Sequence, residues 1–294
     1  MISRIARALA LLLLTATPLF AWGEKGHSLV NEAATFETPN AMPSFFHAAY
    51  PSLVYLGYEP DRWRSAGPAV DDALSADHFL DSEYVADLEL PPARHDYITR
   101  LFESGTLRRY GIGVDAPGFL PWRITEVTLL LEHQFRLWRS SQNVAERKQI
   151  EANIIHYAGI LGHYAGDAAN PHHATIHHNG WVRENPKGYR IDCDSHSRFE
   201  SQFVARAIRL RDVLPHMRER TLRTDYFGAA LEMVRRSYAL VEPLYELDRD
   251  GGFDRRGTVE SRTFAGDRLA AGASFLRDLW WSAYENSKKR PPRD

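Results

Sequence analysis

The sequence His163-Tyr-Ala-Gly-Asp167-Ala-Ala-Asn-Pro171-His172-His173 lies within a long helical pattern near the middle of the chain. Residues four apart share one face of a helix, so His163 and Asp167 should converge at a separation of roughly 5–6 Å. Pro171 disfavours helical backbone at the residue before it, which should end or kink the helix and bring His173 towards the same point. Three potential ligands in one short stretch favour a site for a divalent cation.

The composition is that of an ordinary globular chain except for its histidines. The 294 residues, 44% of them hydrophobic, suffice for one large core or two modest domains. No internal repeat or linker divides residues 22–294, which we expect to form one domain. The formal net charge of −2 gives no basic footprint for duplex binding, although bound metal ions would add positive charge that a residue count omits. Thirteen histidines are the anomaly.

Residues 1–21 have the layout of a secretory signal peptide. Two arginines precede an apolar run at positions 8–14, and Ala21 supplies a small residue before the expected cleavage point. The apolar run is too short for a stable membrane anchor. We therefore expect a secreted or periplasmic protein. Cys193 is the only cysteine, so no intramolecular disulfide can form, and the core and any bound metal must stabilise the exported chain.

Cleavage after Ala21 would create a further candidate metal ligand at Trp22. A free α-amine and the Trp22 carbonyl oxygen form a five-membered chelate. Because an α-amine titrates near about pH 7.7–8.0, a divalent ion can displace its proton at neutral pH. The alternative is an ordinary chain terminus. His27 then opens an amphipathic pattern, which places it on a helix.

The hydrophobic periodicity predicts an all-α fold. Apolar residues recur at helical spacing, and no stretch shows the sustained two-residue alternation typical of strands. Besides the helix that begins near His27, predicted helices cover residues 42–50, 94–104, 121–140, 145–168, 224–248 and 259–286. Residues 58–72 read instead as a turn bounded by proline and an irregular loop.

Further candidate ligands lie on both sides of the central stretch. His196 and Glu200 repeat the four-residue spacing of His163 and Asp167, which makes a second metal-type pair. The segment Ala-Asp-His-Phe-Leu-Asp at 76–81 places a histidine and carboxylates beside an aromatic residue. Taken singly, such polar residues are more often solvated than bound to a metal.

With these residues collected, the chain resembles the zinc-dependent phospholipase C and single-strand-specific nuclease superfamily. Members of that superfamily are all-helical and hold three zinc ions in one cleft. The resemblance covers the whole mature chain from Trp22 to the last helix. It rests on Trp22 and His27, on Asp61, on His78-Phe79-Leu80-Asp81, on His163, Asp167, Pro171 and His173, and on His196 and Glu200.

The resemblance implies three zinc sites within one multi-helix domain. Their ligands would be Asp61, His78, His163 and Asp167 for one ion; Trp22, His27 and Asp167 for a second; and His173, His196 and Glu200 for the third. Asp167 would bridge the first two ions. The gap from Asp61 to His78 is longer than the superfamily usually shows, so Asp71 or Asp72 could compete with Asp61, and Asp77 is a further candidate.

The chemistry of such a cleft suits a phosphodiester. Three divalent ions and three carboxylates leave a charge of about +3, which stabilises the negative charge gained in the transition state. A water shared by two zinc ions near Asp167 would have its pKa lowered towards about 7 and would supply hydroxide for attack on phosphorus, while the third ion stabilises the leaving oxygen. No serine or cysteine nucleophile is required.

The motifs point to two kinds of substrate. Glu200, the Pro171-to-Ala174 segment and residues 268–272 resemble the phospholipase branch. Arg64, three residues after Asp61, resembles a nuclease arginine that touches the phosphate. Asp81 would position this arginine, and Phe79 could be a platform for a stacked base, an apolar wall for a lipid or a core aromatic residue.

We therefore expect a secreted phosphoesterase with three zinc ions that cleaves phospholipids in the manner of a phospholipase C. The alternatives are a single-strand-specific nuclease or 3'-nucleotidase, and a secreted zinc-binding protein without turnover. The expected partners are a phospholipid, with membrane-surface contact through that substrate, or a single-stranded nucleic acid or nucleotide. No protein partner is evident in the sequence.

Overall fold

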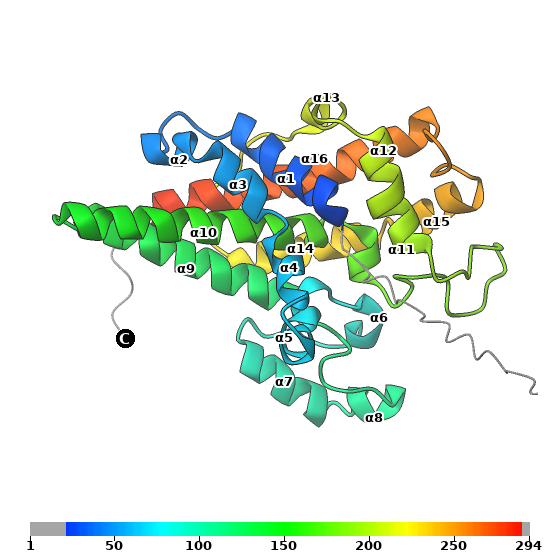
Figure 1. Cartoon of the computed structure of the whole chain (residues 1–294). Coiled ribbons are helices and arrows are strands. Elements are labelled where there is room, and N and C mark those ends of the chain that lie inside the picture. The colour runs from blue at the N-terminus through cyan, green and yellow to red at the C-terminus, as the bar shows by residue number, and fades with distance from the viewer. Residues whose placement is uncertain (1–21, 290–294) are drawn as a thin grey trace, which may run out of the picture.

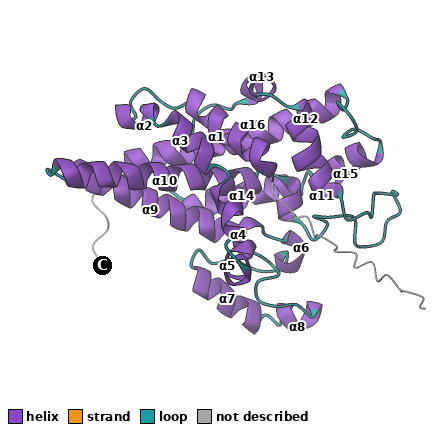
Figure 2. Cartoon of the chain, viewed as in Figure 1, coloured by secondary structure: helices purple, strands orange, loops and turns teal. Residues whose placement is uncertain are grey.

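The computed structural model describes residues 22–289, and the regular elements in that range are helices (Figure 2). The all-α prediction is therefore confirmed. No strand lies within the described range, where the only β-type pairing is an isolated bridge between His178 and Gly180. The predicted signal peptide, residues 1–21, lies outside the described residues, as do residues 290–294. None of the described helices combines the length and apolar character needed to cross a membrane.

The α-helices follow one another with short 3-10 and π segments between them (Figure 1). In chain order they are α1 (Gly23–Phe36), α2 (Ser44–Ala48), α3 (Tyr50–Leu56), α4 (Glu59–Arg64), α5 (Pro68–Leu74), α6 (Ser82–Val85), α7 (Arg94–Glu103), α8 (Thr106–Tyr110), α9 (Leu120–Ser140), α10 (Val144–Ala168), α11 (Ser195–Ser197), α12 (Ala205–Ala207), α13 (Leu210–Val213), α14 (Tyr226–Tyr238), α15 (Val241–Arg249) and α16 (Val259–Asn286). The other segments are the 3-10 turns η1 (Ser75–His78), η2 (Pro171–Ala174) and η4 (Leu214–His216) and the π-helix η3 (Arg198–Val204).

Helix α10 lies at the centre of the molecule, against α1, α3, α9 and α16 (Figure 1). Small residues allow this close packing: a Cβ atom on Gly162 would lie 1.7 Å from Asn31 Oδ1, and one on Gly159 would lie 2.3 Å from Leu56 Cβ. Residues 158–168 are buried without interruption. A helix that is buried all round carries its polar side chains into the interior, so His163 and Asp167 lie inside the protein.

Helix α10 ends at Ala168, as the proline predicts. Asn170 has an extended backbone, with φ −97° and ψ 124°, and its side chain accepts a hydrogen bond from the amide of His172 at 3.1 Å. Pro171 then opens the 3-10 turn η2, in which its missing N–H costs nothing. The turn places His172 and His173 beside the end of α10.

The structure corrects the prediction for residues 58–72, which form helices α4 and α5 instead of a turn and a loop. Pro60 and Pro68 lie in the first turns of these helices, where proline is favoured, so they mark helix starts. This difference bears on the site because Asp61 and Arg64 belong to α4. The helix predicted at 42–50 is shorter in the structure, because α2 covers only Ser44–Ala48 and a separate helix, α3, begins at Tyr50.

Candidate metal centre

Three groups of buried side chains could each hold a metal ion. Within residues 22–289, one ligand atom from each member of a group lies within 4.8 Å of the others. The first group is His27, Asp61 and His163; the second is His78, His163 and Asp167; the third is His173, His196 and Glu200. The second and third groups fall within the predicted zinc sites. The first differs, because it joins His27 to Asp61 and His163 instead of Trp22 and Asp167.

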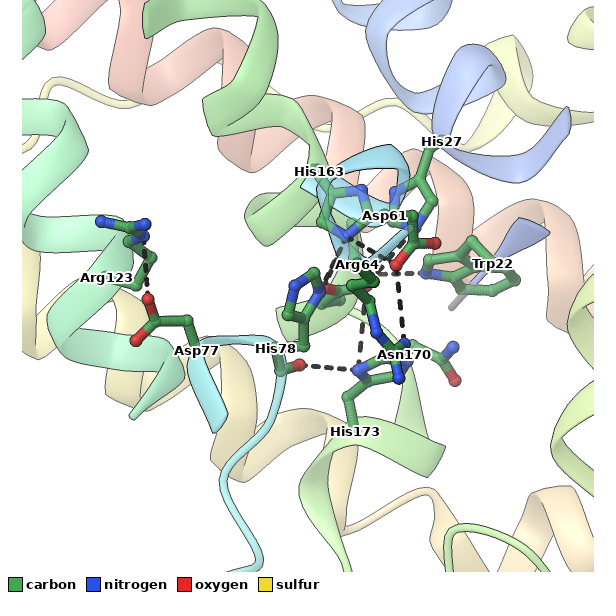
Figure 3. A network of polar contacts seen from close by, with 12 residues as sticks. Trp22, His27, Asp61, Arg64, Asp77, His78, Arg123, His163, Asn170 and His173 are labelled. Atoms are coloured by element: carbon green, nitrogen blue, oxygen red, sulfur yellow. Dashed lines mark hydrogen bonds and ion pairs between the residues drawn. The ribbon is translucent and has the colours of Figure 1, made fainter. Parts of the chain in front are cut away.

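His163, on α10, belongs to both of the first two groups (Figure 3). Its Nδ1 atom donates a hydrogen bond to the main-chain oxygen of Gly57 at 3.0 Å, which leaves Nε2 as the ligand atom. Nε2 lies 3.3 Å from Asp167 Oδ2 and 3.8 Å from Asp61 Oδ1. A hydrogen bond to the far ring nitrogen orients a metal-binding histidine, so Gly57 fixes the direction in which His163 offers its lone pair.

The two carboxylate oxygens of Asp167 face different neighbours. Oδ1 lies 3.5 Å from Nε2 of His27 on α1, and Oδ2 lies 3.1 Å from Nδ1 of His78 on η1. Asp167 itself is fully buried. A carboxylate shared between two ions needs one oxygen directed to each, and this arrangement is compatible with that role. The bridge itself stays a prediction.

The third group forms where η2 meets α11 and the π-helix η3. His196 Nε2 lies 2.7 Å from Glu200 Oε1 and 3.2 Å from His173 Nε2. His173 Nδ1 donates to the main-chain oxygen of His78 at 2.6 Å, which leaves its Nε2 for this group. Glu200 lies on the π-helix, a rare conformation that often occurs at functional sites.

Many of these buried polar atoms lack a hydrogen-bond partner in the described structure. They are both ring nitrogens of His27, both oxygens of Asp61, Nε2 of His78, Oδ1 of Asp167 and Oε2 of Glu200. A buried polar atom without a partner costs about 1–3 kcal/mol, and more when it is charged. Imidazole nitrogens and carboxylate oxygens are the ligand types that zinc accepts, so the residues present fit a cluster built around zinc ions.

The pKa shifts of the buried carboxylates and histidines also fit a site for cations. Burial raises the pKa of Asp61 to about 7, although Arg64 opposes the rise, and burial raises the pKa of Asp167 well above its usual value. Burial also lowers the pKa of His163 to about 3. For His173 burial would lower the pKa, but the carboxylates of Asp167 and Glu200 outweigh it and raise the pKa to about 9. Bound cations would relieve the cost of ionising the buried carboxylates.

Among the acidic candidates, the fold places Asp61 in the cluster. Asp61 is fully buried, whereas Asp71 accepts a hydrogen bond from Arg64 Nε at 2.8 Å and Asp72 is exposed. Asp77 is paired with two arginines. Within the described residues, Asp61 alone of these four belongs to a potential metal group.

A cavity of about 410 Å³ opens beside the second and third groups. Its lining includes the histidines His78, His173 and His196, the predicted substrate residue Phe79, and the predicted catalytic residues Arg64 and Asp81. Burial raises the pKa of Asp81 to about 8, and Glu83 adds to the rise. The roles of Arg64, Asp81 and Phe79, including the positioning of Arg64 by Asp81, stay predictions.

Trp22, the predicted N-terminal ligand, is fully buried next to the cluster. Its indole Nε1 donates to the main-chain oxygen of Gly166 on α10 at 2.7 Å, and its ring centroid lies 5.2 Å from that of Phe199. Its carbonyl oxygen accepts a hydrogen bond from the Gly26 amide at 3.1 Å. Trp22 is therefore anchored near the ligands, and chelation by its amine and carbonyl oxygen stays a prediction.

Two neighbours of the third group were not among the predicted site residues. His172 is buried, its Nε2 lies 3.2 Å from Ser195 Oγ, and its ring stacks on His196 with centroids 5.1 Å apart. Asn170 donates a hydrogen bond to Glu200 Oε1. Both lie in the central stretch, but nothing in their spacing marks them, because their contacts come from a segment more than 20 residues away.

Comparisons with known proteins give structural likeness only. No family model and no curated protein sequence matches the chain. The solved alpha toxin from Clostridium absonum has a TM-score of 0.46 at 13% identity, covering 92% of this chain and 67% of that chain. The alpha-toxin of an avian strain of Clostridium perfringens has a TM-score of 0.45 at 13% identity, covering 92% and 66%. At this level of likeness they assign neither a family nor an activity.

Proposed function

We propose that the protein is a secreted zinc-dependent hydrolase of phosphoric esters, and that its substrates are phospholipids cleaved in the manner of a phospholipase C. The observation that carries the proposal is the convergence of three potential metal groups around Asp167, beside a cavity lined by members of two of them. Secretion rests on the signal-peptide pattern of residues 1–21.

The chain's own residues fit this reaction. The three groups and Trp22 would hold the zinc ions, which when bound would polarise the phosphoryl oxygens and lower the pKa of a bound water. Arg64 lines the cavity and brings the positive charge that a phosphate group needs. Hydrolysis adds water across the phosphorus–oxygen bond, which yields a phosphomonoester and an alcohol, here a diacylglycerol.

The cavity favours a lipid as the first substrate class. Phe79, Tyr84 and Ala116 give it apolar surface beside the histidines. A bound single strand needs a cationic groove for successive phosphates, whereas Arg64 is the one lysine or arginine among the described residues that line this cavity. Residues 1–21 carry two arginines and no acidic residue, so the mature chain would have a formal net charge of 34 − 38 = −4, which agrees with this choice.

A nuclease or 3'-nucleotidase is the second candidate. It is favoured by the shared position of Arg64 and Phe79 on one cavity, where a guanidinium could contact a phosphate and an aromatic ring could stack on a base. The two candidates differ in substrate and share the metal centre, so one experiment separates them.

The test uses the mature chain, stripped with a chelator and reloaded with zinc. Hydrolysis of bis-p-nitrophenyl phosphate should vanish on chelation and return with zinc, and phosphatidylcholine should be cleaved faster than single-stranded DNA or RNA. Asp167→Asn should abolish turnover, whereas Asp278→Asn, at a buried carboxylate on α16 held by Arg223 and Arg277, should retain it. Zinc binding without hydrolysis of any of these substrates would contradict the proposal and favour a zinc-binding protein.

A further inference from the structure

Asp77 lies next to the potential ligand His78, yet its side chain points away from the cluster towards two arginines. Its Oδ1 accepts a hydrogen bond from Arg94 Nη1 on α7 at 2.6 Å, and its Oδ2 lies 3.1 Å from Arg123 Nε on α9. Figure 3 shows the Asp77–Arg123 pair on one side of η1 and His78 on the other. The carboxylate is buried, with 5% of its side chain exposed.

The two arginines are themselves held in place. Arg94 donates hydrogen bonds to the Glu126 carboxylate of α9 from Nε and Nη2, each at 2.8 Å. Arg123 lies over the ring of Tyr164, with its guanidinium carbon 5.4 Å from the centroid. The Tyr164 ring in turn lies 5.5 Å from that of His78. The arginines therefore tie Asp77 to helices α7 and α9, whose positions do not require a bound metal ion.

The turn that carries His78 needs such support. η1 has four residues, too few for its internal hydrogen bonds alone to fix the direction of a side chain. Main-chain hydrogen bonds hold it at Ala76, within the turn, and at Leu80, just past its end. The Phe119 amide donates to the Ala76 oxygen at 2.7 Å, and the Leu80 amide donates to the His173 oxygen at 2.9 Å. The Asp77 side chain adds a contact between these two points, which fixes how the turn is rotated about its own axis.

We propose that Asp77, clamped by Arg94 and Arg123, is a positioning residue that aims His78 at the metal ion of the second group. The proposal rests on the proposed zinc centre and adds to it a residue that is not itself a ligand. Residues that orient ligands typically change metal affinity by about 10- to 100-fold when they are replaced. Asp77 acts through the backbone of the turn, so the loss should fall on the ion that His78 binds.

The test compares Asp77→Asn with Asp278→Asn in the full mature chain. Asp278 is a matched control because it too is a buried carboxylate between two arginines, with Arg223 Nη2 at 3.2 Å and Arg277 Nη2 at 3.0 Å, and it belongs to none of the three groups. Zinc affinities are measured by competition with a chromophoric chelator. The visible spectrum of the cobalt-loaded protein reports the geometry of the bound ions.

Asp77→Asn should weaken one zinc ion by about 10- to 100-fold and alter part of the cobalt spectrum, whereas Asp278→Asn should leave both unchanged even if both variants lose thermal stability. Unchanged affinities and an unchanged spectrum in Asp77→Asn, or equal losses in both variants, would overturn the proposal.

If Asp77→Asn does not fold, Arg123→Gln is the second variant. It keeps the Arg94 contact and should show a smaller loss of zinc affinity in the same direction; unchanged zinc affinities in that variant would also overturn the proposal. A wild-type chain that binds no zinc would instead refute the proposed function.

Discussion

His173 Nδ1 donates a hydrogen bond to the main-chain oxygen of His78 at 2.6 Å, although 95 residues separate the two in the sequence. The amide of Leu80 returns a hydrogen bond to the main-chain oxygen of His173 at 2.9 Å. These two hydrogen bonds connect His78, a member of the second group, with His173, a member of the third. Substitution of His173 should therefore lower the metal affinity of the second group, whereas substitution of His196 should not.

This coupling predicts different metal contents for two single variants. His196→Ala should remove the ion of the third group and leave about two zinc ions per chain after dialysis. His173→Ala should remove the same ion and also weaken the ion bound by His78, because it breaks the hydrogen bond to the His78 oxygen. Equal zinc contents and equal affinities of the remaining ions in the two variants would show that the groups are independent.

A second prediction concerns the N-terminus. A chain that begins at Trp22 has an α-amine to offer, whereas a chain with one additional methionine before Trp22 has an amide at that point. The extended chain should bind one zinc ion fewer, with an unchanged helical circular-dichroism spectrum. Equal zinc contents would remove Trp22 from the ligand set and leave His27 with Asp61 and His163 as its only group.

The pKa shifts predict how the metal-free protein responds to pH. The pKa values of Asp61 (about 7), Asp81 (about 8) and His173 (about 9) all lie above those of the unfolded chain, and that of Asp167 is raised too. Several buried histidines, His163 among them, have lowered pKa values, but above about pH 7.5 a histidine of the unfolded chain is neutral as well, so these groups contribute little there. From about pH 7.5 to 9 the folded state therefore holds protons that the unfolded state has lost, and the free energy of unfolding should fall as the pH rises.

Thermal unfolding of the chelated protein at several pH values measures this trend. Asp81→Asn should make the fall in Tm with rising pH less steep, because it removes a titrating carboxyl that is not a predicted ligand. With zinc bound, Tm should instead rise with pH. The ligands bind the metal only when they are deprotonated, so the increase in Tm caused by zinc should grow with pH. A chelated protein whose Tm rises from about pH 7.5 to 9 would contradict these pKa directions.

Phe79 provides a test of the substrate cavity. Removing an aromatic ring from an apolar contact costs about 1–2 kcal/mol, so Phe79→Ala should raise KM for a short-chain phosphatidylcholine by roughly 10-fold with kcat little changed. Phe102→Ala is the control, because Phe102 is a 65% exposed phenylalanine on α7 outside the cavity lining. Identical KM values for the two variants would mean that Phe79 does not contact the lipid.

The sequence was informative where local spacing determines geometry. The pair His163 and Asp167 lies on one helical face, and Pro171 ends the helix that carries it, because both features depend on residues a few positions apart. The all-α class also follows from local periodicity. These features marked His163, Asp167, His173, His196 and Glu200, whereas Asp61 entered the predicted set only through the resemblance to a known superfamily.

What the sequence could not supply depends on distant contacts. The prolines near Asp61 indicate turns, but in the structure they begin helices α4 and α5, and the packing of α4 against α10 depends on the fold. Asp77 was a candidate ligand because it adjoins His78, and the two arginines that hold it come from helices 17 and 46 residues further along the chain. The membership of the first group likewise depends on how α1, α4 and α10 meet.

Elemental analysis of the purified mature chain shows whether these buried side chains hold three zinc ions. After dialysis against metal-free buffer, we expect close to three zinc ions per chain and about one after Asp167→Asn, since Asp167 is the predicted ligand shared by two of the ions. A folded wild-type chain that retains no zinc, and takes up none when zinc is added back, would refute the proposed zinc centre.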